Sequence, residues 1–141
     1  MTISTLVDSN IFIDILNAGA QPEHQEWSSR QLDEASDLGV LCLSAVAWAE
    51  ISQPYPDERT LLSALRPFGL HYEALPFEAA YPAGQAHRLY RTRGGRRERT
   101  LPDFLIGAHA MVAGHRLLTR DASRYRDYFP ELDIICPETH P

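Results

Sequence analysis

The chain has 141 residues, of which 44% are hydrophobic and 23% are charged, so it can form one compact domain with a buried core. This composition excludes a disordered chain and a coiled coil, and no apolar run approaches the length of a membrane span. All basic side chains are arginines, which excludes mechanisms that need a catalytic or phosphate-binding lysine. Two cysteines without metal-type spacing and an N-terminus without a signal-type segment indicate a reduced, cytoplasmic protein.

The first third of the chain alternates short apolar strands with helices. Residues 3–7 are predicted to form a buried strand, followed by a helix over about 10–17. A second, amphipathic helix is predicted to begin near Pro22 and to stop at Gly39. A second buried strand over 40–43 then leads into a helix over 45–52 that Ser44 can cap.

The middle of the chain is predicted to be mainly helical. A helix begins near Asp57, and residues 71–75 form a weaker strand that can lie at a sheet edge. Residues 77–93 are predicted to form a longer helix that Pro82 delays or kinks. Residues 94–101 are predicted to form a mobile, arginine-rich loop.

The last third returns to the strand–helix alternation. A helix over about 102–114 precedes a strand over 116–119, and a short helix over 125–129 precedes a last strand over 133–136. Strands that alternate with helices at this rhythm predict an α/β protein with a mainly parallel sheet covered on both faces. No repeat, linker or boundary is visible, so residues 1–141 are predicted to be a single domain.

Two acids directly follow predicted buried strands. Asp8 follows the first strand and Asp121 follows the strand over 116–119, and the carboxyl ends of parallel strands are where open α/β sheets build their sites. Asn10 can cap the first helix or point its amide at the same crevice, and Thr119 precedes Asp121. Simple turn formation is the alternative for Asp8, Asn10 and Asp121, and a plain strand residue is the alternative for Thr119.

Two further acids lie on predicted helices. Glu50 is the only acid on an otherwise apolar helix, so its carboxylate either reaches solvent or meets a positive group. Asp103 lies in the first turn of its helix, where the helix dipole alone favours an acid. If these acids converge with Asp8 and Asp121, their mutual repulsion requires protons or a divalent cation. An all-oxygen ligand set suits magnesium or manganese and metal-assisted phosphodiester hydrolysis.

The same residues resemble a known family along the whole chain. The stretches 8–10, 101–110 and 117–121, together with Glu50, are similar to the PIN-domain ribonucleases, and most of all to VapC-type toxins of bacterial toxin–antitoxin pairs. The resemblance implies a three-layer α/β/α sandwich, RNA cleavage that depends on Mg²⁺ or Mn²⁺, a neutralising antitoxin and a homodimer. In that pattern Asp8, Glu50, Asp103 and Asp121 are the catalytic, metal-binding acids, and Asn10 and Thr119 orient them.

A cluster of arginines precedes Asp103. Six arginines and one glutamate between residues 88 and 99 give this segment a charge of +5, within a chain of net charge −6. They are predicted to hold RNA phosphates, and a solvated helix end is the alternative. These candidate RNA-binding residues are Arg88, Arg91, Arg93, Arg96, Arg97 and Arg99.

Other polar residues are given structural roles. Asp14 and Asp127 are predicted to be surface acids, and His109 is predicted to be packed or partly exposed, since the six histidines lack ligand spacing. Two other functions are alternatives to the ribonuclease. An aspartyl-phosphate enzyme with Asp8 as nucleophile is disfavoured because the chain has no lysine. A catalytically silent PIN-fold module that binds RNA or protein is the other alternative.

Overall fold

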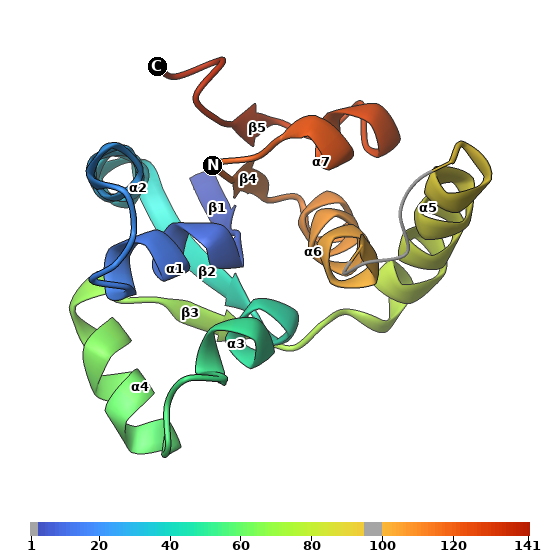
Figure 1. Ribbon diagram of the computed structural model, residues 1–141. Coiled ribbons are helices and arrows are strands. Elements are labelled where there is room, and N and C mark those ends of the chain that lie inside the picture. The colour runs from blue at the N-terminus through green and yellow to red at the C-terminus, as the bar shows by residue number, and fades with distance from the viewer. Residues whose placement is uncertain (1–2, 95–99) are drawn as a thin grey trace.

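The computed structural model describes residues 3–94 and 100–141 (Figure 1). Within these residues, five strands form one sheet in the order β3-β2-β1-β4-β5, and every neighbouring pair is parallel. The strands are β1 (Ile3–Val7), β2 (Gly39–Ser44), β3 (His71–Glu73), β4 (Arg116–Leu118) and β5 (Ile134–Ile135). The predicted α/β class and parallel sheet are therefore confirmed, with β3 at an edge as expected.

Helices cover both faces of this sheet. Figure 1 shows α1 and α2 on one side of the strands and α5 and α6 on the other. The α-helices are α1 (Ser9–Leu16), α2 (Pro22–Leu38), α3 (Ala45–Ser52), α4 (Glu58–Leu65), α5 (Ala80–Thr92), α6 (Thr100–Ala113) and α7 (Ser123–Tyr128). Two short 3₁₀ helices, η1 (Arg66–Phe68) and η2 (Phe77–Ala79), complete the described elements. No helix among them is long and apolar enough to cross a membrane.

Most predicted boundaries differ from the observed ones by one or two residues. The helix predicted over 77–93 is divided into η2 and α5, because Pro82 fits only the first turn of an α-helix. The loop predicted over 94–101 lies largely outside the described residues, but α6 begins at Thr100 and so takes its last part.

The strand order places a crevice beside β1. The chain runs from β1 outward to β2 and β3, and later returns to the other side of β1 to add β4 and β5. Such a reversal leaves a crevice at the carboxyl ends of the two strands that flank it, here β1 and β4. Asp8 and Asp121 follow these two strands in sequence.

Close packing of α6 against α7 closes one side of this crevice. A Cβ atom added at Gly107 would lie 2.6 Å from Cε2 of Phe129 and 3.0 Å from Cδ1 of Tyr125, so only glycine admits both rings here. The side chains of Tyr125 and Phe129 are almost fully buried, and so is that of Phe104, which lies on α6 like Gly107. Tyr125 is thereby held at a fixed distance from the end of β1.

Candidate active site

Asp8 lies at the centre of the site. It caps the N-terminus of α1 and is only 3% exposed. Its Oδ1 accepts a hydrogen bond from the backbone N–H of Ser9 at 2.7 Å, and its Oδ2 accepts from Thr119 Oγ1 at 2.8 Å and from the Tyr125 hydroxyl at 2.9 Å. Burial and the nearby charge of Asp103 raise its pKa from 3.8 to about 6, although these three hydrogen bonds oppose the rise.

Asn10 and Thr119 connect the ends of β1 and β4. Asn10 lies in the first turn of α1. The N-cap position of this helix, which is one of the two roles predicted for Asn10, is occupied by Asp8. The Asn10 amide donates to Thr119 Oγ1 at 3.1 Å, and its Oδ1 accepts from the backbone N–H of Arg120 at 3.2 Å. These bonds hold the two loops together and leave Asp8 with few conformations to adopt.

Asp103 enters from the first turn of α6 and is paired with Arg124 of α7. Arg124 Nη1 lies 2.5 Å from Asp103 Oδ2. Burial raises the pKa of Asp103, and the negative charge of Asp121 adds to the effect, while Arg124 opposes both. The single positive guanidinium therefore compensates only part of the local negative charge.

Asp121 completes a small cavity at this end of the sheet. Its side chain is exposed, and its Oδ1 accepts from the backbone N–H of Ser123 at 3.2 Å and from the Ser123 hydroxyl at 2.9 Å. The cavity has a volume of about 60 Å³ and is lined by Asp8, Asn10, Asp103, Asp121, Arg124 and Tyr125. A water molecule needs about 10–15 Å³ of such space, so the cavity has room for an ion and a few waters.

Glu50 does not line this cavity. It is half-buried on α3 and lines a separate hollow with Ile13 and Tyr55. Its negative charge nevertheless contributes to the raised pKa of Tyr125, after burial, Asp8 and Asp103, so it acts on the site electrostatically. The structure thus brings three of the four predicted acids around one cavity and leaves Glu50 in a separate hollow.

The donor set of the cavity fits a hard divalent cation. Three carboxylates and one amide surround it, and within residues 3–94 and 100–141 no sulfur or imidazole group lines it. Asp8 is a buried acid whose pKa is raised partly by another acid, so a cation that neutralises both would relieve the repulsion. Mg²⁺ and Mn²⁺ prefer such oxygen ligands.

The described arginines of the predicted RNA-binding group lie on α5 and at its end. Arg88 and Arg91 line an exposed hollow with His87, and the guanidinium of Arg93 lies 5.5 Å from the centre of the Tyr128 ring. The remaining predicted members, Arg96, Arg97 and Arg99, lie outside the described residues. Arg124 stands 5.8 Å from the Tyr90 ring of α5, which links that helix to the cavity.

The prediction that Asp14 is a surface acid was wrong. Asp14 is 3% exposed, and its Oδ2 accepts from Ser28 Oγ at 2.8 Å and from Arg120 Nε at 2.7 Å. Arg120 Nη2 reaches the other carboxylate oxygen at 3.2 Å. The ion pair fixes the loop that follows β4 against α1, and so positions the neighbouring Asp121. Asp127 is exposed, as expected.

Sequence reasoning missed Arg124 and Tyr125, which both line the cavity. The sequence indicates their position only in part: a helix that follows Asp121 must pack near the carboxyl end of the sheet. The polar faces of a six-residue helix give too little periodicity to show which side chains point inward.

A PIN-domain family model matches residues 5–128, which is most of the chain. The chain belongs to the PIN-domain family. No curated protein sequence matches it significantly.

Solved structures of similar fold come from bacterial toxin–antitoxin complexes. VapBC2 of Rickettsia felis, bound to a promoter DNA fragment, has a TM-score of 0.70 at 16% identity, over 95% of this chain and 98% of that one. A toxin–antitoxin complex from Klebsiella pneumoniae has a TM-score of 0.62 at 19% identity, over 93% and 95%. DNA-bound VapBC of Salmonella typhimurium has a TM-score of 0.63 at 21% identity, over 95% and 98%. At these identities the PIN chain shares the fold with them.

Proposed function

We propose that this PIN domain is a metal-dependent endoribonuclease that acts as the toxin of a toxin–antitoxin pair. The observation that carries the proposal is the cavity where Asp8, Asp103 and Asp121 meet at the carboxyl ends of β1 and β4. Membership of the PIN family and the toxin–antitoxin origin of the similar structures support it. The whole chain, residues 1–141, would act as a single nuclease domain.

In this proposal Asp8 and Asp103 hold the principal Mg²⁺ or Mn²⁺ ion, and Asp121 and Glu50 complete the site directly or through water. A bound divalent cation activates water for attack on a phosphodiester and stabilises the charge that develops on the phosphate. Asn10 and Thr119 keep the Asp8 carboxylate in place through the contacts described above. Tyr125 donates to Asp8 Oδ2, the same oxygen that accepts from Thr119.

Arg124 would act on the substrate phosphate. Among the described residues it is the cation that lines the cavity, and its side chain is 38% exposed, so it is accessible to RNA. Asp103 would hold the ion, and the planar fork of the Arg124 guanidinium, which now pairs with Asp103, would be suited to donate to phosphate oxygens. Arg88 and Arg91 would extend this positive approach along α5.

Partners follow from the same proposal. We infer a cognate antitoxin, because the similar structures are toxin–antitoxin complexes, and a homodimer as the family resemblance implies. Two large aromatic side chains near the start of α5 stand out from the surface, Phe77 at 89% exposure and Tyr81 at 75%. If they form the dimer contact, Phe77→Ser should convert the dimer into a monomer in analytical ultracentrifugation.

Cleavage of labelled total RNA by the purified protein tests the function. The assay compares Mg²⁺, Mn²⁺ and chelator for the wild type, Asp8→Asn and Asp103→Asn, with Asp127→Asn as a matched control on an exposed acid. We expect discrete fragments that need metal, that disappear in the two cavity variants and that persist in the control. Absence of cleavage with either ion, while RNA is still bound, would instead favour a catalytically silent binding module. Cleavage that survives both cavity substitutions would reject the site.

A further inference from the structure

A second cluster of polar side chains lies between the sheet and α6, apart from the acidic cavity. It contains Cys42 of β2, Glu73 of β3, His109 of α6 and His115, which precedes β4. Glu73 Oε1 lies 2.8 Å from His115 Nε2 and 3.0 Å from His109 Nε2. The Cys42 sulfur, a Glu73 carboxylate oxygen and a ring nitrogen of His115 all lie within 4.8 Å of one another.

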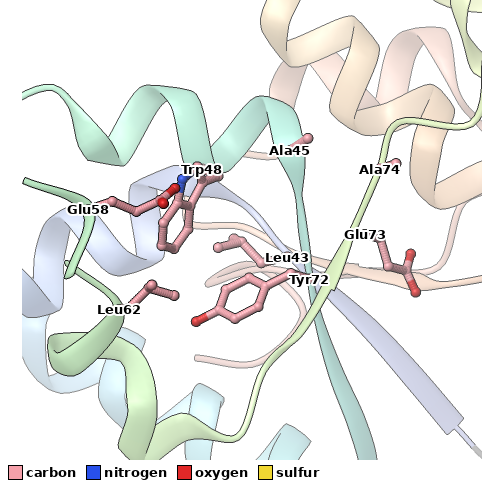
Figure 2. A pocket seen from close by; sticks show the side chains of 8 residues that line it. All are labelled: Leu43, Ala45, Trp48, Glu58, Leu62, Tyr72, Glu73 and Ala74. Carbon is pink, nitrogen blue, oxygen red and sulfur yellow. The ribbon is translucent and has the colours of Figure 1, made fainter.

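The pairing of β2 with β3 explains why Cys42 meets Glu73. Ser44 pairs with Glu73, and side chains two residues apart on a strand share a face, so Cys42 and Glu73 both point toward α6. The intervening Leu43 and Tyr72 face the opposite side. Figure 2 shows a hollow that Glu73 lines together with Trp48, Leu62 and Tyr72, and the Glu73 carboxylate is directed away from these three side chains.

The chemistry of the cluster differs from that of the acidic cavity. It combines a thiol, an imidazole and a carboxylate, which is a donor set suited to Zn²⁺ and poorly suited to Mg²⁺. Cys42 is 2% exposed and the His115 side chain is 8% exposed, whereas the Glu73 side chain is 32% exposed and gives the cluster access to solvent. A thiolate and a carboxylate together carry two negative charges, which one zinc ion neutralises.

We propose that Cys42, Glu73 and His115 form a zinc-binding site whose fourth position is open to water. Ligand atoms around a tetrahedral zinc ion lie roughly 3.3–3.8 Å apart, given bond lengths of about 2.0–2.3 Å. The observed separations of up to 4.8 Å therefore need only small adjustments, and the contact of 2.8 Å between Glu73 and His115 must open slightly. On binding, the Cys42 thiol loses its proton to solvent and no other bond changes.

Two neighbouring side chains orient the ligands. His115 Nδ1 lies 2.6 Å from Ser4 Oγ, so this hydroxyl can accept from Nδ1–H and leave the Nε2 lone pair directed at the metal. His109 is fully buried, and its Nε2 lies 3.0 Å from Glu73 Oε1. Its Nε2–H can then donate to Glu73 Oε1 and fix the carboxylate without binding the ion itself.

Zinc at this position would join the sheet edge to the sheet centre. β3 is a three-residue strand held by β2 alone, while His115 is anchored to Ser4 of β1. Because the ligands converge only in the folded chain, metal binding stabilises the fold. None of the three proposed zinc ligands lines the acidic cavity, so zinc binding here does not depend on nuclease activity.

Titration of the metal-free full-length protein with Zn²⁺ and Co²⁺ tests the site. Co²⁺ bound to a thiolate gives a charge-transfer band in the near ultraviolet, and this band reports Cys42 directly. The other buried free cysteine provides the control, Cys136→Ser. We expect a thiolate band that saturates with one Co²⁺ per Cys42 site and a raised Tm with Zn²⁺ in the wild type and the control, and loss of the band in Cys42→Ser.

Further variants separate this site from the acidic cavity and from misfolding. Glu73→Gln changes a partly exposed group and should weaken Zn²⁺ by more than the roughly 10- to 100-fold that loss of an outer-shell partner costs. Asp8→Asn and Asp103→Asn should keep the thiolate band. A wild-type protein without the band, or Zn²⁺ affinity unchanged in both Cys42→Ser and Glu73→Gln, would overturn the proposal and leave the cluster as a hydrogen-bonded network.

Discussion

The hydroxyl of Tyr125 donates a 2.9 Å hydrogen bond to Oδ2 of Asp8, across 117 residues of sequence. Both side chains are almost fully buried, and Gly107 lets the Tyr125 ring pack directly against α6. The bond favours the charged form of a carboxylate whose pKa burial has raised to about 6. Tyr125 therefore helps Asp8 to be ionised, and so competent to bind a cation, near neutral pH.

Replacing this tyrosine tests that role. In Tyr125→Phe the pKa of Asp8 should rise further, by about one unit, because a hydrogen bond to a charged group is lost while the ring is kept. Carbon-13 NMR titration of the carboxyl groups in metal-free protein measures the shift. Tyr128→Phe is the control, since the Tyr128 ring packs edge-on against Phe104 rather than bonding to Asp8. An Asp8 pKa equal to that of the wild type would show that the hydroxyl has no such role.

The raised pKa of Asp8 also predicts a pH dependence of stability. The folded state binds this proton more tightly than the unfolded state does, so the free energy of unfolding falls as pH rises from about 4 to about 6. The rise of the Asp8 pKa from 3.8 to about 6 corresponds to about 3 kcal/mol of stability, and this contribution is lost in full above pH 6. In chelator, Asp8→Asn should therefore gain stability relative to the wild type between pH 4 and pH 7.5. Urea unfolding measures this, and a pH-independent difference between the two proteins would contradict it.

Arg124 should affect metal binding and cleavage in opposite directions. Its guanidinium occupies Oδ2 of Asp103, so Arg124→Ala should raise Mg²⁺ affinity several-fold at pH 8 by removing a competing cation. RNA cleavage should fall by about tenfold or more, because a donor to the phosphate is lost. The free energy of unfolding should change by less than about 1 kcal/mol, since the pair is partly exposed. Calorimetry and single-turnover cleavage measure the two effects.

Arg124→Lys separates charge from geometry in the same assays. It keeps a positive charge but not the planar fork, so Mg²⁺ affinity should stay near the wild-type value while cleavage is only partly restored. Cleavage at the full wild-type rate in Arg124→Ala would contradict the assigned role.

The pair between Asp14 and Arg120 should matter for stability. Removing the acid in Asp14→Ala leaves Arg120 without its partner and Ser28 without its acceptor, so the free energy of unfolding should fall by about 2–3 kcal/mol. That is below the usual cost for a fully buried pair because the Arg120 side chain is 30% exposed. Asp127→Ala replaces an exposed acid and should change the free energy of unfolding by less than about 0.5 kcal/mol. Equal effects of the two substitutions in urea unfolding would reject the assignment.

The exposed arginines of α5 should carry the salt dependence of RNA binding. In the double variant Arg88→Gln/Arg91→Gln, affinity for single-stranded RNA should fall, and the slope of log affinity against log salt should decrease by about 0.7 for each lost phosphate contact. The same change at two other exposed arginines, Arg59 near the start of α4 and Arg66 at the start of η1, is the control. Equal slopes for both double variants and the wild type would assign the α5 arginines to a solvated surface.

Much of the fold could be predicted because its signals are local. An apolar run followed by an acid placed Asp8 and Asp121 at strand ends, and Pro22 indicated the start of α2. The acidic cavity followed from one topological rule about parallel strands. Glu50 was harder to place, because helical spacing gives a face of α3 but not the direction in which that helix is packed.

The remaining features depend on contacts between distant residues. The burial of Asp14 could not be predicted from the sequence, because its partner Arg120 lies 106 residues away and no pattern in the chain links the two. The cluster at Cys42, Glu73 and His115 has no motif spacing, since its members come from β2, β3 and the turn before β4. Only the register of the sheet and the packing of α6 bring them together.

The order of the strands has a consequence for synthesis of the protein. Asp8 is synthesised 111 residues before Thr119 and 117 residues before Tyr125, the two side chains that donate to its Oδ2. Until β4 is made, the edge of β1 that β4 will cover stays unpaired. For the proposed nuclease, translation therefore delays assembly of the site until β4 and α7 have been synthesised.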